Sequence, residues 1–412
     1  MNINNRKIIF FEPEMQGGMG HHMDNLIESS IYFKKFGKII WITNKSFNEQ
    51  NLFVPKFVQR LNLIETFESK NFLSKIIKLV KDIAYNFIFI IINLRIKKFK
   101  NIPGTLKNNF FTFPEYFQSF SKFLKLDDFS NDDLIIVQSC RPKDIELMHF
   151  ALNVFPTFPK VILRVLYPPK RKKLKNFFYF FNNLQNNPNT KNKIKIFTEV
   201  DSVKNIIENE LKIKINNFSQ IYTLFNRKNN NELVTGFLGE SRIDKGFDKL
   251  PKFIENLNQK NEEVKFIIQF SKKKYLETEF FKDKIINLAK KNKNISIFNG
   301  YLDFFEYRNL LKKITIMPIF YTLDQINNLG SGLFYSCITH EIPMVIPKGS
   351  DQFKKYLLTN NYLEADSEYD YIKQIITIHE NYDYFLNESK KLSKIYSQNI
   401  ETCLLVKEVK GI

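Results

Sequence analysis

Two cations and two glycines stand close together in the stretch GFLGESRIDKGFDKLP, residues 236 to 251. Small apolar residues lead into Gly239, Arg242 and Lys245 lie three residues apart, and Gly246 follows the lysine directly. Apolar residues then recur at helical spacing, so both cations are expected in a loop between a strand and a helix. The free N–H groups of a helix N-terminus, a guanidinium and an ammonium together favour a di-anion such as a pyrophosphate. The alternative interpretation is an ordinary surface loop with capping residues.

A second glycine loop, EPEMQGGMGHH, follows the apolar run KIIFF near the N-terminus. Glycines allow the backbone to approach a ligand closely. A histidine directly after them could donate to a phosphate or act as an acid or base, whereas a lone histidine is more often structural. The candidates in this loop are Gly17, Gly18 and Gly20 for close approach, His21 and His22 for catalysis, and Glu14 as a general base or acceptor-orienting group.

Three further charged residues lie at the end of, or inside, apolar runs that are typical of strands. Arg141 follows LIIVQSC and is a candidate for holding the acceptor or a phosphate. Glu199 follows KIKIFT at another expected strand end and is a weaker candidate. Arg164 lies inside VILRVLY, and because a charge within an apolar strand needs a partner, we interpret this residue as structural.

The elements that must position these residues alternate between strand and helix. In the first half the expected strands cover 7–11, 38–43, 134–139, 160–167 and 193–198. Expected helices follow the first glycine loop and cover 143–154 and 202–211. Strand–helix–strand units build parallel sheets. The pattern therefore predicts a doubly wound α/β domain.

A polar stretch without periodicity, NRKNNNE, covers 226–232 and is the expected linker. A second alternating series follows it, with expected strands at 233–239, 264–270, 295–300, 314–321 and 342–347. The tail YDYFLNESKKLSKIYSQNI has the pattern of an amphipathic helix. We therefore expect two tandem Rossmann-like domains, residues 1–229 and 230–381, and a C-terminal helix within 382–412 that returns to the first domain.

The composition fits a globular chain with anionic partners. It has 412 residues, 43% of them hydrophobic, which is enough for two full-sized cores. The net charge of +19 favours an anionic ligand or surface, although a solvated lysine-rich surface explains much of it. The cysteines, Cys140, Cys337 and Cys403, lie far apart, so neither a disulfide framework nor a zinc site is expected.

The sequence indicates a cytoplasmic protein. The N-terminus lacks the apolar core of a signal peptide. The longest uncharged apolar run, 83–94, is shorter than the about 20 residues that a membrane-spanning helix needs. Attachment to the inner face of the cytoplasmic membrane is compatible with these features.

Two basic–apolar segments are candidates for contact with an anionic membrane. Residues 75–100 place cations on both sides of the apolar run, although a buried core helix with solvated ends explains the same pattern. In PPKRKKLKNFFYFFNN, residues 168–183, five cations precede five aromatic residues. This order favours a membrane surface or an acidic acceptor.

The stretch with Arg242 and Lys245 resembles the donor-phosphate motif of the GT-B-fold glycosyltransferases, specifically the nucleotide-sugar-dependent group 1 or family 4 type. In that family a strand ending in glycine is followed by an arginine, then by Lys-Gly and a helix, and the two cations hold the diphosphate. The resemblance implies the same role for Arg242 and Lys245. Glu240 stands where the commonest form of the motif has its arginine, and the variant Gly-acidic-x-Arg-x-acidic-Lys-Gly matches better.

Residues 299–347 resemble the rest of the family's donor domain. NGYL is similar to the loop beside the nucleotide base, MPIFY to the strand end before the sugar pocket, and GSGLFYSCITHEIPMVIP to the segment around ribose and phosphate. The resemblance adds to the donor-binding set Gly239, Gly246, Tyr301, Leu302, Tyr321, Ser331, Gly332 and Leu333. Asn328 and Ser336 stand where the most familiar subgroup has two glutamates, and Asp324 is a candidate replacement for the ribose carboxylate.

The resemblance implies two domains that face each other across a cleft, and an enzyme that moves a sugar from a nucleoside diphosphate sugar to an acceptor hydroxyl. It further implies retention at the anomeric carbon, no bound metal and no cofactor besides the donor. By analogy, the acceptor is a glycan or lipid-linked molecule of bacterial surface glycan or lipopolysaccharide assembly.

Two alternatives stay open at this point. One is a GT-B-fold sugar-nucleotide epimerase. The other is a basic membrane- or nucleic-acid-binding protein without catalysis. The sequence carries no zinc-finger, RNA-binding or helix-turn-helix pattern, so no nucleic-acid partner is expected.

Overall fold

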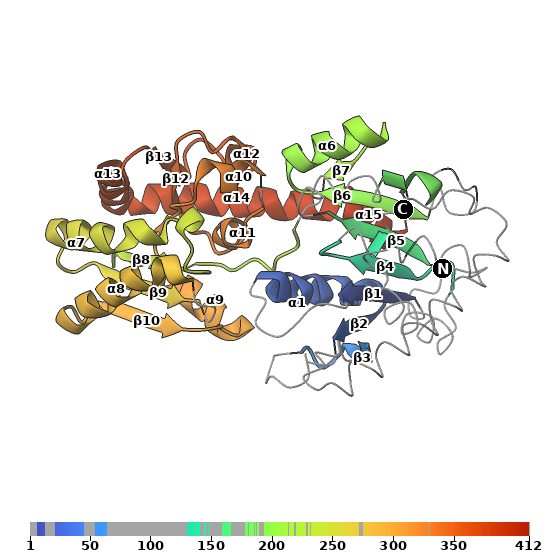
Figure 1. Cartoon of the computed structure of the whole chain (residues 1–412), viewed down its shortest axis with the longest axis horizontal. Coiled ribbons are helices and arrows are strands. Elements are labelled where there is room, and N and C mark those ends of the chain that lie inside the picture. Colours follow the sequence, from blue (N-terminus) through green and yellow to red (C-terminus); the bar gives the residue numbers. More distant parts are fainter. Residues whose placement is uncertain are drawn as a thin grey trace. The chain divides into compact units, whose positions relative to one another are not determined.

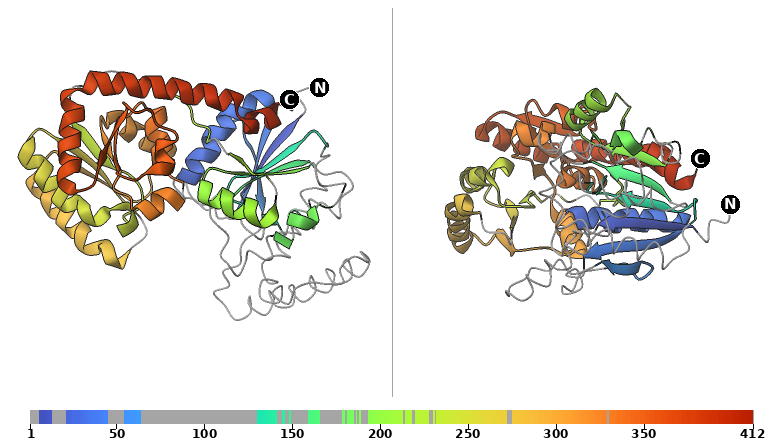
Figure 2. Two further views of the ribbon diagram at one scale, coloured as in Figure 1. Left: turned by 90° about the horizontal axis from the view of Figure 1, so that it is seen from above. Right: turned by 45° about the vertical axis from the view of Figure 1, so that its right-hand side comes forward.

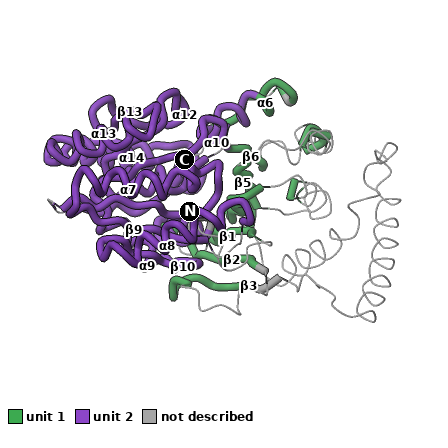
Figure 3. The backbone as a smooth tube through the Cα atoms, turned by 60° about the vertical axis from the view of Figure 1, so that its left-hand side comes forward, with its two compact units in different colours: residues 1–17, 33–197, 206–216 green, residues 18–32, 198–205, 217–412 purple. Residues whose placement is uncertain are grey.

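The computed structural model has two compact units (Figure 3). Unit 1 comprises Met1–Gly17, Phe33–Phe197 and Ile206–Asn216, and unit 2 comprises Gly18–Tyr32, Thr198–Asn205 and Asn217–Ile412. The structure describes residues 6–12, 21–44, 54–63, 130–140, 144–145, 148, 159–165, 178–179, 181–184, 186, 188, 193–212, 214–217, 220–227, 230, 232–271, 275–328 and 330–411. The domain boundaries expected at 229/230 and 381/382 stay a prediction.

The first sheet, built mainly from unit 1, has the strand order β3-β2-β1-β4-β5-β6-β7 (Figure 1). Its strands are β1 (Lys7–Glu12), β2 (Lys38–Asn44), β3 (Gln59–Leu63), β4 (Leu134–Val137), β5 (Lys160–Arg164), β6 (Ile194–Thr198) and β7 (Asn216–Asn217). The pairs from β3 through β6 are parallel. Ile8, Ile9, Phe10 and Phe11 on β1 are completely buried. Since neighbouring residues point to opposite faces, both faces of this strand are covered, as is typical of parallel sheets.

The strand order of the first sheet reverses at β1. The chain adds β2 and β3 on one side of β1, and β4, β5 and β6 on the other. In doubly wound sheets ligands bind beyond the carboxyl ends of the strands at such a switch point. In unit 1 this point lies where β1 ends at Glu12 and β4 ends at Val137.

Two described helices connect the strands of this sheet. α1 (His21–Phe33), with the 3-10 turn η2 (Lys34–Phe36) at its end, links β1 to β2, and α6 (Asp201–Leu211) follows β6. Met23, Leu26 and Ile27, from the predicted apolar face of α1, are buried. Glu28 on α1 forms an ion pair with Arg308, with 2.8 Å between Oε1 and the guanidinium nitrogen. Both residues of this pair belong to unit 2.

The centre of unit 2 contains the sheets β10-β9-β8 and β11-β12-β13. A parallel bridge between Thr235 and Ile316 joins them, so the combined order is β10-β9-β8-β11-β12-β13. Their strands are β8 (Val234–Phe237), β9 (Lys265–Phe270), β10 (Ile295–Asn299), β11 (Met317–Pro318), β12 (Met344–Pro347) and β13 (Tyr362–Ala365). All pairs are parallel. The order reverses between β8 and β11, which gives unit 2 its own switch point.

Helices surround the strands of unit 2 (Figure 2). From residue 217 on, unit 2 contains the helices α7 (Leu250–Lys260), α8 (Glu279–Lys291), α9 (Phe304–Lys313), α10 (Leu323–Asn328), α11 (Gly332–Thr339), α12 (Asp351–Lys354), α13 (Glu368–Glu380), α14 (Tyr382–Thr402) and α15 (Leu404–Lys410), with 3-10 turns η5 (Ile243–Lys245), η6 (Phe247–Lys249) and η7 (Leu276–Thr278). Phe247 packs edge-on against Phe270, and Phe253 packs edge-on against Phe320. These four rings are buried in one core, and each contributes about 1.5–3 kcal/mol through burial. The packing fixes the start of α7 and thereby the loop before it.

The predicted alternation of strands and helices is confirmed for the described strands of both halves, for α1 and α6, and for the helices between the strands of unit 2. The helix expected at 143–154 lies mostly outside the described residues. The strand expected at 314–321 is shorter than predicted, because Ile314 still caps α9 and β11 covers only Met317–Pro318. The helix expected in the tail is α14, which ends before an extended Cys403 and is followed by α15.

The two basic–apolar segments, 75–100 and 168–183, lie entirely or mostly outside the described residues. Within the ranges that the structure describes, no helix has both the length and the hydropathy to cross a bilayer. Membrane contact through these segments stays a prediction.

Candidate functional site

The loop after β8 depends on two glycines. Gly239 has a φ of 121° and Gly246 a φ of 76°, both in the left-handed region that favours glycine. At Gly246 a Cβ atom would approach Phe320, to 2.3 Å from its Cβ and 2.6 Å from its carbonyl oxygen. The amide of Thr322 donates to the carbonyl oxygen of Asp244 at 2.9 Å. The loop is therefore held against the segment that follows β11, at the switch point of unit 2.

Arg242 is held by three acceptors within unit 2. Its guanidinium binds both carboxylate oxygens of Asp244, donates to Glu240 Oε2 at 3.0 Å and lies 3.3 Å from Gln325 Oε1. The hydrogen bond from Arg242 lowers the pKa of Asp244, and the same bond raises the pKa of Arg242. The charge of this arginine is thus balanced inside the loop.

Lys245 lacks a comparable partner. Its ammonium makes no hydrogen bond or ion pair with any other described residue, and Nζ lies 5.7 Å from the ring centroid of Tyr321. Burial lowers the pKa of Lys245, while the charge of Glu240 acts in the opposite direction. A Cβ on Gly239 would lie 3.7 Å from Nζ, so the ammonium stands over bare backbone. A partly desolvated cation in this position favours an anionic ligand.

The N-terminus of α11 lies beside the same tyrosine. Ser331 is the N-cap residue, and its Oγ accepts from the amide of Phe334 at 3.3 Å. Burial raises the pKa of the Tyr321 hydroxyl, and the nearby Ser331 side chain acts in the opposite direction. Gly332 is the first helical residue, and Leu333 is buried in the core. The free N–H groups of the first turn and the helix dipole add positive potential here.

Glu199 supports the loop that precedes α11. A Cβ on Gly330 would overlap with Glu199 Oε1, so only glycine fits beside this carboxylate. Gln220 donates to Glu199 Oε2 at 2.5 Å, and Gln352 donates to the Glu199 carbonyl oxygen at 2.8 Å. The structure thus places Glu199, a weak candidate from the sequence, as a buried group beneath this loop.

Gln269 on β9 connects the loops that follow β8 and β10. Its Oε1 accepts from the amide of Gly239 at 2.9 Å, and its Nε2 donates to the carbonyl oxygen of Gly300 at 2.9 Å. Sequence reasoning missed this residue, although a polar residue inside the apolar strand VKFIIQF is a detectable signal. Tyr301 and Leu302 follow directly; Leu302 is buried, and burial raises the pKa of Tyr301.

Other predicted residues are engaged elsewhere. Asp324 accepts from Asn328 within α10 at 2.6 Å, and Ser336 donates to the carbonyl oxygen of Gly332 within α11 at 2.9 Å. Arg164, interpreted as structural, is buried and interacts with other residues of the chain. In the part of the chain that the structure describes, no group of three or more His, Cys, Asp or Glu side chains is placed to hold a metal ion.

Several predicted residues lie outside the structural description. His21 and His22 form the first residues of α1, but their side chains are not described. The remaining ones lie outside the described residues altogether: Glu14, Gly17, Gly18, Gly20 and Arg141.

The switch point of unit 1 contains Glu12, which sequence reasoning missed. This residue ends β1 and is 4% exposed. Its Oε1 accepts from the amides of Gln138 at 2.5 Å and Ser139 at 3.1 Å, and its Oε2 binds the hydroxyl of Ser139. Burial raises the pKa of Glu12 to about 7, and the charge of Asp144 adds to the rise. The edge of this sheet therefore carries a carboxyl that titrates near neutral pH.

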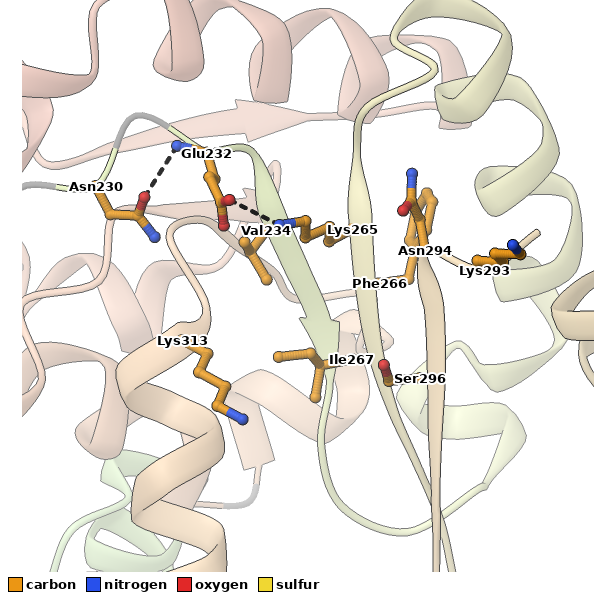
Figure 4. Close-up of a pocket in the computed structure, with 10 residues that line it drawn as sticks. All are labelled: Asn230, Glu232, Val234, Lys265, Phe266, Ile267, Lys293, Asn294, Ser296 and Lys313. Atoms are coloured by element: carbon orange, nitrogen blue, oxygen red, sulfur yellow. Dashed lines mark hydrogen bonds and ion pairs between the residues drawn. The ribbon is translucent and has the colours of Figure 1, made fainter.

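A small pocket of about 290 Å³ lies at the opposite, amino-terminal edge of the unit 2 sheet (Figure 4). The starts of β8, β9 and β10 line it with Val234, Lys265 and Ser296, and Lys313 from the end of α9 extends along its side. Lys265 is paired with Glu232 at 2.7 Å. None of the residues in the loop after β8 lines this pocket, so it is separate from the cation cluster.

Comparison with known proteins establishes the fold. No family model matches the sequence, and no curated protein matches it. A solved structure of an S. aureus TarM mutant, in complex with fondaparinux, alpha-GlcNAc-glycerol and UDP, has a TM-score of 0.60 at 13% identity over 98% of each chain. A glycosyltransferase from Rickettsia africae has a TM-score of 0.58 at 13% identity, over 98% of this chain and 99% of that one.

A sucrose-phosphate synthase from Thermosynechococcus elongatus is also similar, with a TM-score of 0.57 at 9% identity over 96% of this chain and 94% of that one. These matches extend over nearly the whole chain, and both units contain a doubly wound parallel sheet. The protein therefore has the GT-B fold, with two Rossmann-like α/β domains.

Proposed function

We propose that this protein is a glycosyltransferase that moves a sugar from a nucleoside diphosphate sugar to an acceptor hydroxyl. The observation that carries the proposal is Lys245, a partly buried cation whose ammonium makes no hydrogen bond or ion pair with another described residue, placed over Gly239 at the switch point of unit 2. The GT-B fold supports it, because similar structures include TarM with UDP and a Rickettsia africae glycosyltransferase.

In this proposal unit 2 binds the donor. Lys245 and the N–H groups at the start of α11 bind the diphosphate, and Arg242 supplies a second cation beside its carboxylate partners. Negative charge grows on the leaving oxygen as its bond to the sugar breaks. Fixed positive groups stabilise that charge without having to reorganise, which is how such sites lower a reaction barrier.

The sequence resemblance supports finer parts of the proposal. It implies that Tyr301 and Leu302 lie beside the nucleotide base and that Tyr321 lies at the sugar pocket. It also implies that Ser331, Gly332 and Leu333 lie around the ribose and phosphate. It also favours retention, catalysis without a metal or cofactor, and an acceptor of surface-glycan or lipopolysaccharide assembly.

The remaining roles rest on sequence patterns alone. Acid–base chemistry would fall to His21, His22 or Glu14, and Arg141 would hold the acceptor. A cytoplasmic location with peripheral attachment to the inner membrane face, through the two basic–apolar segments, belongs to the same part of the proposal.

A thermal-shift screen against UDP-, GDP-, ADP- and dTDP-sugars tests the proposal. A ligand at 100 times its Kd stabilises the folded state by about 2.7 kcal/mol, which is readily measured. The variant R242A/K245A should lose this stabilisation and all donor turnover. The control K249A removes an exposed lysine from the adjacent turn η6 and should behave like the wild type.

Product analysis separates the alternatives. An epimerase would release an altered nucleotide sugar without any acceptor, whereas a transferase needs one. A membrane- or nucleic-acid-binding protein without catalysis would keep its function in R242A/K245A. Unchanged donor turnover in that variant would remove the proposed mechanism.

A further inference from the structure

The end of β1 in unit 1 carries a side-chain arrangement that the donor site does not use. Glu12 is the last residue of β1, and Gln138 and Ser139 follow the last residue of β4. β1 and β4 are neighbours in the sheet, and the strand order reverses between them. This is the position at which doubly wound sheets bind their ligands.

Three donors converge on the Glu12 carboxyl group. The amides of Gln138 and Ser139 donate to Oε1, and the hydroxyl of Ser139 is bonded to Oε2. Glu12 and Gln138 are buried, whereas Ser139 is only half-buried. Ser139 is therefore the member of this cluster that a molecule from solvent reaches first.

Among the described residues, no positively charged side chain acts on Glu12. Thr43, its register partner on β2, is a buried hydroxyl. Beyond β4, Cys140 and Asp144 are both buried. Burial raises the pKa of the Cys140 thiol, so it stays neutral, and Asp144 is the one charged group among the described residues that acts on Glu12.

We propose that Ser139 recognises the hydroxyl group of the acceptor substrate, and that Glu12 is the positioning residue that orients the serine. The ionised Glu12 carboxylate accepts the hydrogen bond that Ser139 Oγ–H donates, which leaves the lone pairs of Oγ free to accept a hydrogen bond from a substrate hydroxyl. Protonated Glu12 donates toward Oγ instead, and the serine hydrogen then turns outward. The inference rests on the proposed glycosyl transfer, and its ligand class is a sugar or polyol hydroxyl.

The cluster predicts a pH dependence of acceptor recognition. The pKa of Glu12 lies at about 7, because burial disfavours its charged form. Acceptor binding should therefore be weaker at pH 6 than at pH 8, by up to about tenfold for a substrate hydroxyl that must donate to Ser139, since only about a tenth of Glu12 is ionised at the lower pH. Donor binding, which depends on unit 2 residues, should not follow this titration.

Saturation-transfer NMR with a panel of para-nitrophenyl monosaccharides at pH 6 and pH 8 tests the proposal. Wild type should bind a glycoside more tightly at pH 8. The variant E12Q, whose amide donates to Ser139 at every pH, should bind weakly at both pH values with unchanged donor affinity. S139A should also bind weakly, S139T should restore binding, and T43V should resemble the wild type.

The outcomes separate this inference from the proposed function. Wild-type pH dependence retained in E12Q, unchanged glycoside binding in S139A, or no glycoside binding by the wild type at either pH would each overturn the inference. Because S139A leaves both amide bonds to Glu12 intact, it tests the inference even if E12Q fails to fold. Glycoside binding with the predicted pH dependence but without binding of any nucleotide sugar would overturn the proposed function instead.

Discussion

The two switch points of this molecule share a topology, but their backbone amides donate hydrogen bonds to different kinds of side chain. In unit 2 the amide of Gly239 donates to the neutral side chain of Gln269, and Lys245 stands over the same glycine. In unit 1 the amides of Gln138 and Ser139 donate to the carboxylate of Glu12. Among the described residues, the same kind of sheet edge thus carries an unpaired cation in one unit and a buried carboxyl in the other.

This difference indicates which ligand each edge accepts. The strand ends of a doubly wound sheet present N–H groups that are suited to an anion. In unit 1 the protein's own carboxylate occupies those groups, so a phosphate would meet a like charge. In unit 2 the acceptor for the Gly239 amide is the neutral oxygen of Gln269, which does not repel an external anion at Lys245. We therefore expect the diphosphate in unit 2 and a neutral hydroxyl in unit 1.

The largest effect on stability is expected at Gly246, where the loop backbone of unit 2 lies against Phe320. Replacement of Gly246 by alanine forces a Cβ into Phe320 and imposes a left-handed φ of 76°, so it should cost on the order of 3 kcal/mol in unfolding free energy. Gly300 provides a matched control, because its φ is 88° and a Cβ added there would have no atom within 4 Å. G300A should cost only about 1–2 kcal/mol in chemical denaturation. Equal losses of unfolding free energy in G246A and G300A would argue against the close contact between Gly246 and Phe320.

The next effect concerns nucleotide binding, and is expected when the neutral acceptor at the unit 2 sheet edge is replaced by a carboxylate like that of unit 1. Gln269→Glu places a carboxylate where the Gly239 amide now meets a neutral oxygen, and like-charge repulsion should weaken nucleoside diphosphate binding about tenfold or more. Gln269→Met removes both hydrogen bonds without adding charge and should weaken binding less. Titration calorimetry with UDP, GDP and ADP measures both. The electrostatic comparison fails if the methionine variant loses as much affinity as the glutamate variant.

A pH-dependent effect is expected from the buried carboxyl of unit 1. Because the pKa of Glu12 is raised from 4.5 to about 7, its contribution to stability is complete below about pH 4.5 and is lost as the pH rises through 7. E12Q should therefore gain stability relative to wild type between pH 5 and pH 8, by up to roughly 3 kcal/mol. Urea denaturation at the two pH values measures the difference. A constant difference would show that Glu12 does not titrate in this range.

Much of the fold could be predicted because its strands are buried on both faces. Runs such as KIIFF and VKFIIQF are apolar and short, and they become β1 and β9. β3 and β13 were missed because they lie at sheet edges and carry polar residues, so their patterns resemble loops. The strand expected at 314–321 was predicted too long at its start because Ile314 still caps α9, whereas at its other end the amide of Ile319 still donates to the carbonyl oxygen of Val345.

The residues of the candidate site also differ in how readily the sequence predicts them. The loop with Gly239, Arg242 and Lys245 could be found because its cations and glycines are neighbours in the sequence. Glu12 could not, because its partners lie 126 and 127 residues away and meet it only through the pairing of β1 with β4. Contacts of this kind depend on sheet topology, which a local pattern does not contain.

The central claim is that Lys245, whose ammonium makes no hydrogen bond or ion pair with another described residue, binds a diphosphate. Titration calorimetry of UDP, GDP and ADP against wild type, K245A and K249A tests it most directly. A charge-assisted bond contributes about 1.5–3 kcal/mol, so K245A should bind its best nucleotide roughly 10- to 100-fold more weakly, while K249A should match the wild type. Equal affinity in K245A and wild type would contradict the account.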